Sequence, residues 1–153
     1  MGFKEWQTPP DFFAELNAQF HFTLDAAASH ENALCTNYCT PEGTFRKRPG
    51  KSPYQAYGLD GLALPWISEK VFCNPPYDAS LYRWVEKAAG SWARVSVLLL
   101  PPSVDTAWFH DFIWGHGETV ETHFLRGRLK FWRDGVPGPA PRAGNLIAIF
   151  RRP

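Results

Sequence analysis

The chain has 153 residues, of which 44% are hydrophobic and 20% charged, as is typical of an ordinary soluble globular protein. This length favours one domain over residues 1–153, and the chain shows no internal repeat and no second domain. The formal net charge of +1 does not mark a nucleic-acid-binding protein, so any binding charge must be concentrated locally. No apolar run approaches the roughly 20 residues of a membrane helix, which excludes a membrane-spanning protein.

The first half of the chain predicts a helix, two short strands and an irregular basic loop. The helix starts near Thr8-Pro9-Pro10, with Thr8 as a plausible N-cap. The later elements, in order, are a strand over 21–24 ending in Asp25, an irregular loop over about 42–57, an apolar segment over 58–64 that carries Asp60, and a buried strand over 71–73 ending at Asn74.

The second half alternates helical and strand patterns. It predicts helices over 81–92 and 105–114, strands over 95–100, 119–124 and 146–150, a segment over 128–132 that pairs or begins a hairpin, and a Pro/Gly loop over 135–141. Such alternation predicts an α/β domain with a mostly parallel central sheet. Ligands bind beyond the carboxyl ends of parallel strands, so Asp25, Asp60 and Asn74 are expected to share one cleft.

The segment Asn74-Pro75-Pro76-Tyr77 is the sharpest chemical signal. An exocyclic aromatic amine is a poor nucleophile, and an enzyme can activate it by accepting hydrogen bonds from its two N–H groups. The Asn74 side-chain oxygen and the Pro75 carbonyl, held rigid by the adjacent prolines, are suitable acceptors. Tyr77 offers a flat face on which an extruded base can stack. The alternative is a rigid turn that only ends a strand.

Asp25 and Asp60 are candidate cofactor ligands. A carboxylate after a strand can hold a cationic amino group, and the small residues 26–28 allow a ligand to approach the backbone closely. Asp25 has an equally good explanation as a helix cap. Asp60 either accepts a hydrogen bond from the adenine amine of a nucleoside cofactor or lies in an ordinary turn.

Two groups of basic residues are candidates for binding DNA phosphates, or else are solvated loops: Arg46, Lys47, Arg48 and Lys51, and Arg126, Arg128, Lys130 and Arg133. The three cysteines, Cys35, Cys39 and Cys73, are an odd number and fit a reducing compartment. Free thiols are favoured over a zinc site built from His30, Cys35 and Cys39, because no fourth ligand has a convincing spacing. The aromatic content of 16% fits a ring-rich core, in which some rings could form a base-stacking surface.

Taken together, these motifs resemble the phage-type DNA N6-adenine methyltransferases along nearly the whole chain. The resemblance rests on Trp6-x-Thr8-Pro9, Leu24-Asp25-x-Ala27-Ala28, Asp60-Gly61-Leu62 with Trp66, Asn74-Pro75-Pro76-Tyr77, Leu100-Pro101, Asp105-Thr106-x-Trp108-Phe109 and Gly127-Arg128-Leu129-x-Phe131.

The resemblance implies a Rossmann-like fold, S-adenosyl-L-methionine as methyl donor and DNA as substrate. It also implies roles for particular residues: Trp6, Thr8, Pro9, Asp25, Ala27 and Asp60 at the cofactor, Asn74 to Tyr77 in catalysis, and Arg128, Lys130 and Phe131 near the target base or DNA backbone. No metal is implied, and the location expected is the cytoplasm of the host cell if the gene is phage-encoded. Two alternatives remain: N-methylation of RNA or of a protein glutamine, and a non-catalytic nucleic-acid-binding module.

Overall fold

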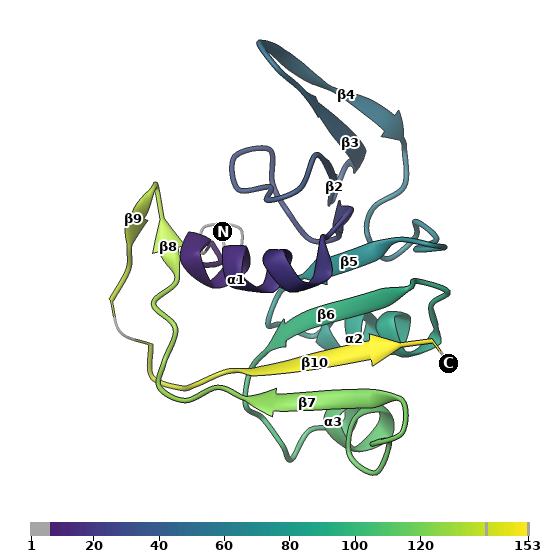
Figure 1. Ribbon diagram of the computed structural model, residues 1–153, viewed down its shortest axis with the longest axis vertical. Coiled ribbons are helices and arrows are strands. Elements are labelled where there is room, and N and C mark those ends of the chain that lie inside the picture. Colours follow the sequence, from purple (N-terminus) through teal and green to yellow (C-terminus); the bar gives the residue numbers. More distant parts are fainter. Residues whose placement is uncertain (1–6, 140, 153) are drawn as a thin grey trace.

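The computed structural model describes residues 7–139 and 141–152, and its centre is one eight-stranded sheet (Figure 1). The strand order is β4-β3-β2-β1-β5-β6-β10-β7. The strands are β1 Leu24–Asp25, β2 Asn37–Thr40, β3 Gly43–Arg48, β4 Lys51–Tyr57, β5 Lys70–Cys73, β6 Val95–Leu100, β7 Val120–Phe124 and β10 Leu146–Arg151.

The sheet is mixed, so the prediction of a mostly parallel sheet is wrong. Three pairings are parallel: β2 with β1, β1 with β5, and β5 with β6. The other four pairings are antiparallel, because β2, β3 and β4 follow one another through short turns and β10 runs back between β6 and β7. The parallel group still brings the carboxyl ends of four strands to one edge, which is where a ligand site is expected.

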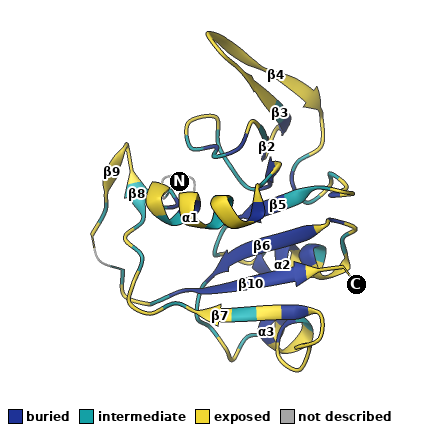
Figure 2. Ribbon diagram, in the orientation of Figure 1, coloured by how far each residue is buried: buried dark blue, intermediate teal, exposed yellow. Residues whose placement is uncertain are grey.

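Helices cover both faces of the sheet, as expected for an α/β fold. Helix α1 (Pro10–Phe20) packs on the face that presents Val97, Leu99 and Ile149. Helices α2 (Leu81–Gly90) and α3 (Ala107–Phe112) pack on the opposite face, against the alternate residues of the same strands. Strand β6 is therefore buried along its whole length, which confirms the prediction from its continuous apolar run (Figure 2).

Residues 42–57 do not form the irregular loop that their composition predicted. They form the β3–β4 hairpin, which projects at the top of Figure 1. Pro53 is tolerated because β4 is an edge strand and because its pairing with β3 is irregular at this point. Gly50 adopts a positive φ of 68° and supplies the turn.

The segment after β7 confirms one alternative, since a hairpin begins at Trp132, but the predicted Pro/Gly loop over 135–141 contains a strand. The Pro/Gly-rich region contains a second, two-stranded sheet made of β8 (Trp132–Arg133) and β9 (Val136–Pro137). Trp132 also forms a bridge with Gln7. The helices are shorter than predicted, and Pro9 rather than Thr8 occupies the N-cap of α1. No helix in the described parts of the chain combines the length and apolar character needed to cross a bilayer.

Candidate active site

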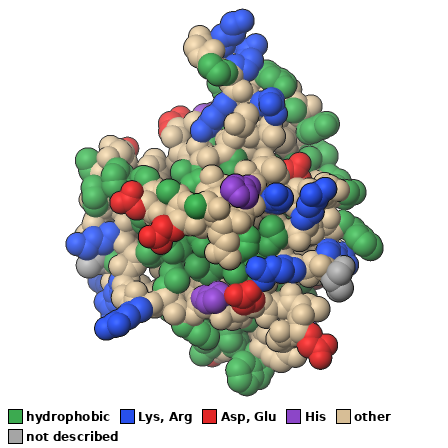
Figure 3. Space-filling view, in the orientation of Figure 1, with side chains coloured by type: hydrophobic (Ala, Val, Ile, Leu, Met, Phe, Trp, Pro, Cys, Tyr) green, Lys and Arg blue, Asp and Glu red, His purple; other side chains and the backbone are tan. Residues whose placement is uncertain are grey.

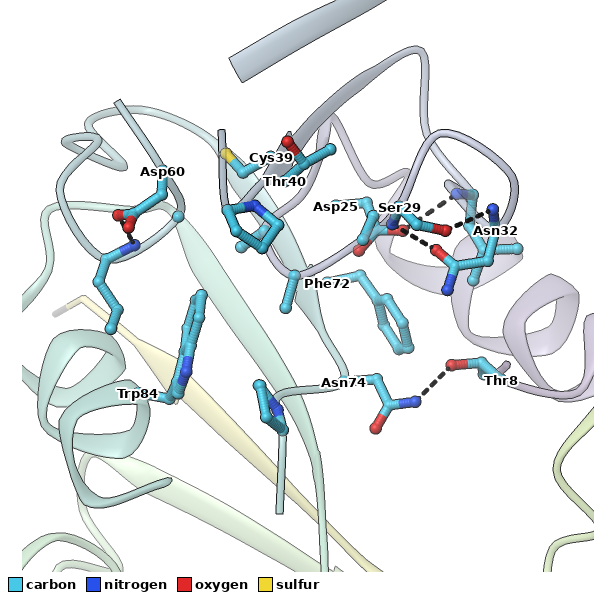
Figure 4. Close-up of a pocket in the computed structure, with 18 of the residues that line it drawn as sticks. Thr8, Asp25, Ser29, Asn32, Cys39, Thr40, Asp60, Phe72, Asn74 and Trp84 are labelled. Carbon is cyan, nitrogen blue, oxygen red and sulfur yellow. Dashed lines mark hydrogen bonds between the residues drawn. The ribbon is translucent and has the colours of Figure 1, made fainter. Parts of the chain in front are cut away.

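A cavity of about 690 Å³ lies at the carboxyl edge of β1, β2 and β5 (Figure 4). Its size falls in the usual range of small-molecule sites. Residues 7–8, 25–32, 39–42 and 60–62 line it, together with Leu34, Phe72, Asn74, Pro76, Asp78, Ser80 and Trp84. The structure thus brings Asp25, Asp60 and Asn74 to one cavity, as the sequence predicted.

Asp25 is a buried carboxyl group at the end of β1, with 3% of its surface exposed. Its Oδ2 accepts a hydrogen bond from the Leu34 backbone N–H at 3.0 Å, which closes the loop between β1 and β2. No helix begins at this point, so the helix-cap explanation is wrong. Burial raises the pKa of Asp25 to about 7, although the backbone N–H groups of Leu34 and Ala27 oppose the shift.

The small residues after Asp25 allow a close backbone contact inside the site. A Cβ atom at Gly61 would lie 2.0 Å from the Ala26 carbonyl oxygen and 2.8 Å from the Trp84 ring. Only glycine therefore fits between these two residues. This contact sets the turn at Asp60 directly against the end of β1.

Asp60 lies in a turn three residues after β4 and not at the strand end that the sequence had predicted. Its Oδ1 accepts hydrogen bonds from the backbone N–H groups of Leu62 at 3.1 Å and Ala63 at 2.9 Å. Lys87 of α2 fixes the same turn by donating from Nζ to the carbonyls of Leu62 and Leu64, at 3.0 and 2.7 Å. The carboxylate of Asp60 is thus held in place at the cavity wall.

Asn74 follows β5 and is held by a residue 66 positions earlier in the chain. Its Nδ2 donates to the Oγ1 of Thr8 at 3.1 Å, and its Oδ1 is turned away from Thr8 (Figure 4). Thr8 is buried, and both residues line the cavity. With Nδ2 donating to Thr8, Oδ1 is the end of the Asn74 amide that remains to accept a hydrogen bond from a ligand.

The other residues of the motif form a wall between two cavities. Pro75 is buried, Pro76 lines the main cavity, and Tyr77 instead lines a neighbouring cavity of about 410 Å³ that also contains Tyr82 and Trp108. Asp78 lines both cavities.

Asn145 anchors this wall and was not singled out in the sequence analysis. The Tyr77 hydroxyl donates to the Leu99 carbonyl at 3.0 Å and accepts from Asn145 Nδ2 at 3.1 Å. Asn145 also donates to the Leu100 carbonyl at 3.1 Å. Burial raises the pKa of Tyr77 far above its usual range, so the phenol stays neutral. The only sequence feature that could have marked Asn145 as a site residue is its position, a polar residue just before the strand β10.

Other residues expected near the cofactor or DNA take no part in lining the main cavity or lie outside the described residues. Arg128, Lys130 and Phe131 do not line the main cavity. Arg128 is exposed and donates to the Pro141 carbonyl at 3.0 Å, whereas Phe131 packs with the α1 face of the core. Trp6 lies outside the described residues, and Pro9 caps α1 without lining the cavity.

The three cysteines are buried, free thiols. Burial raises the pKa of each of them above its ordinary value, so all three are protonated at neutral pH. His30 meets the Tyr38 hydroxyl through Nδ1 at 2.7 Å, and Cys39 meets the Thr44 hydroxyl at 3.4 Å. Across residues 7–139 and 141–152, no cluster of three His, Cys, Asp or Glu side chains is arranged to hold a metal ion.

Residues 4–152 match the model of the DNA N-6-adenine-methyltransferase (Dam) family. The chain belongs to this family. A DNA N-6-adenine-methyltransferase of Escherichia phage T1 is 30% identical in an alignment of 165 residues that includes 95% of the chain. The chain spans 62% of the length of that relative.

Proposed function

We propose that this Dam-family protein transfers a methyl group from S-adenosyl-L-methionine to the N6 amine of adenine in DNA. The observation that carries the proposal is the bond between Asn74 and Thr8 beside a cavity that also holds a buried carboxyl group. Asn74 can then present a fixed acceptor to an amine, and Asp25 can bind a cation.

The donor set of the cavity fits S-adenosyl-L-methionine. The Asp25 carboxyl is buried with two backbone N–H partners, and an ammonium group beside it would favour its ionised form. Asp60 and Ala27 line the same cavity and would face the remainder of the cofactor. When bound, the cofactor supplies an electrophilic methyl group attached to sulfur.

The Asn-Pro-Pro-Tyr segment would receive the adenine. Asn74 Oδ1 and the Pro75 carbonyl would accept hydrogen bonds from the N6 hydrogens and so localise the nitrogen lone pair for attack. The Tyr77 ring, in the adjoining cavity, would stack on the extruded base. This arrangement requires the base to reach the wall between the two cavities.

The experiment is transfer of a tritiated methyl group from S-adenosyl-L-methionine to unmethylated DNA, to RNA and to bulk protein. We expect incorporation into DNA alone. Incorporation only into RNA or protein would replace the proposed substrate, and cofactor binding without any transfer would indicate a binding module.

A further inference from the structure

The β3–β4 hairpin is an exposed two-stranded ribbon that extends beyond the body of the protein (Figures 1 and 3). All seven residues of β4 are exposed, as are residues 46–50. The hairpin contains four cations and no Asp or Glu between residues 43 and 57. Among the described residues, no carboxylate lies within 4.0 Å of any of these four cations.

Three of the four cations share one face of the ribbon. Arg46 pairs with Tyr54 and Arg48 with Lys51, and side chains directly opposite each other in a strand pair project to the same side. The guanidinium of Arg48 lies 5.6 Å from the centre of the Tyr54 ring, which confirms the shared face. Lys47 points the other way and donates to the Ala33 carbonyl.

The pairing of Arg48 with Lys51 is unfavourable for the isolated hairpin. Like charges directly opposite each other destabilise a strand pair, and no described carboxylate compensates for them. A bound polyanion would remove this repulsion by placing a phosphate between the two cations.

The base of the hairpin is fixed to the main cavity. Thr44 donates to the Leu59 carbonyl at 2.7 Å, and the Phe45 ring lies 4.6 Å from the ring of His30, which lines the cavity. The residues just before the hairpin, Thr40 to Glu42, line the cavity as well. A molecule bound along the ribbon would therefore lie beside the cavity.

We propose that the β3–β4 hairpin is an arm that binds the phosphates of duplex DNA next to the target base, an inference that rests on the proposed function. The major groove admits a two-stranded β-ribbon, and Arg and Lys are the usual phosphate ligands. The Tyr54 ring holds the Arg48 guanidinium on the basic face.

The test is the salt dependence of binding to a short duplex, measured by fluorescence anisotropy with S-adenosylhomocysteine present. The variant is Arg48→Gln with Lys51→Gln. The matched control, Lys70→Gln with Arg94→Gln, removes two charges at the start of β5 and just before β6, the sheet edge opposite the cavity. Loss of two phosphate contacts should lower the slope of log K against log salt by about 1.8.

We expect the hairpin variant to show this smaller slope and weaker binding, while the control matches the wild type. Equal slopes for variant and wild type, or a wild type without salt-dependent duplex binding, would overturn the inference. A smaller slope that the hairpin variant shows with duplex RNA but not with duplex DNA would overturn it as well. Methyl transfer to the same duplex, measured in parallel at low salt, tests the proposed function separately: its absence in the wild type rejects that function and leaves the slope comparison intact.

Discussion

The Tyr77 hydroxyl lies between the Leu99 carbonyl and the Asn145 side chain, at 3.0 and 3.1 Å, and joins the wall of the candidate site to β6 and β10. A buried hydroxyl that satisfies two partners is costly to remove, because both lose a bond that water cannot replace.

Tyr77→Phe should therefore lower the free energy of unfolding by about 1–3 kcal/mol while keeping the ring. Tyr82→Phe is the control, since its hydroxyl bonds to Asp111 at the surface and its loss should cost clearly less. Urea denaturation of the two variants provides the comparison. Equal losses would mean that the buried network does not stabilise the fold.

The bond from Asn74 to Thr8 predicts a second effect. Thr8→Val keeps the shape of the side chain but removes the acceptor of the Asn74 amide, so kcat should fall roughly 3- to 10-fold, the equivalent of one neutral hydrogen bond. Thr8→Ser should restore most of the rate. The affinity for the cofactor, measured by calorimetry, should change less than kcat. A Val variant with the wild-type rate would show that the bond does not orient Asn74.

Asp25 should control cofactor binding in a pH-dependent way. Asp25→Asn should raise the Kd for S-adenosyl-L-methionine roughly 10- to 150-fold, because it removes a charge-assisted hydrogen bond. Since the pKa of Asp25 in the folded protein is about 7, wild-type affinity should rise as pH increases through 7. The variant should lack this rise, and a rise of equal size in both proteins would remove Asp25 from the site.

The same carboxyl group predicts the pH dependence of stability without cofactor. The folded state holds the Asp25 proton up to about pH 7, whereas the unfolded chain loses it near the ordinary aspartate pKa of 3.8. Between these values the folded state binds more protons, so the contribution of Asp25 to stability falls as pH rises. The free energy of unfolding of the wild type, minus that of Asp25→Asn, should therefore fall from pH 4 to pH 7.

Gly61 provides a test of the packing between the turn at Asp60 and the end of β1. Gly61→Ala places a Cβ atom 2.0 Å from the Ala26 carbonyl, so we expect a loss of about 1–3 kcal/mol or more, with weaker cofactor binding. Gly58→Ala, three residues earlier, meets nothing within 4 Å and should be close to neutral. Similar thermal midpoints for the two variants would contradict the assigned contact.

The sequence predicted the buried elements better than the exposed ones. The apolar runs of β6 and β10 are buried on both faces, and their patterns gave these strands nearly to the residue. The β3–β4 hairpin was missed because its Pro, Gly, Lys and Arg residues have low strand propensity, and an edge strand tolerates them. Local composition cannot reveal such pairing.

The sequence predicted the main residues of the candidate site but not the hydrogen bonds that hold them. Strand ends placed Asp25 and Asn74 correctly, because their position follows from local pattern. The bonds of Thr8 to Asn74 and of Asn145 to Tyr77 span 66 and 68 residues, and no local pattern encodes them. Sequence reasoning also assigned Thr8 to a helix cap, a role that Pro9 takes.

Methylation at adenine N6 through Asn74 is tested by nucleoside analysis of DNA treated with the wild type and with Asn74→Ala, with cofactor binding measured for both. We expect N6-methyladenine from the wild type, none from the variant, and similar cofactor affinity in the two proteins. Near wild-type turnover by Asn74→Ala, or methylation at a position other than adenine N6, would contradict it.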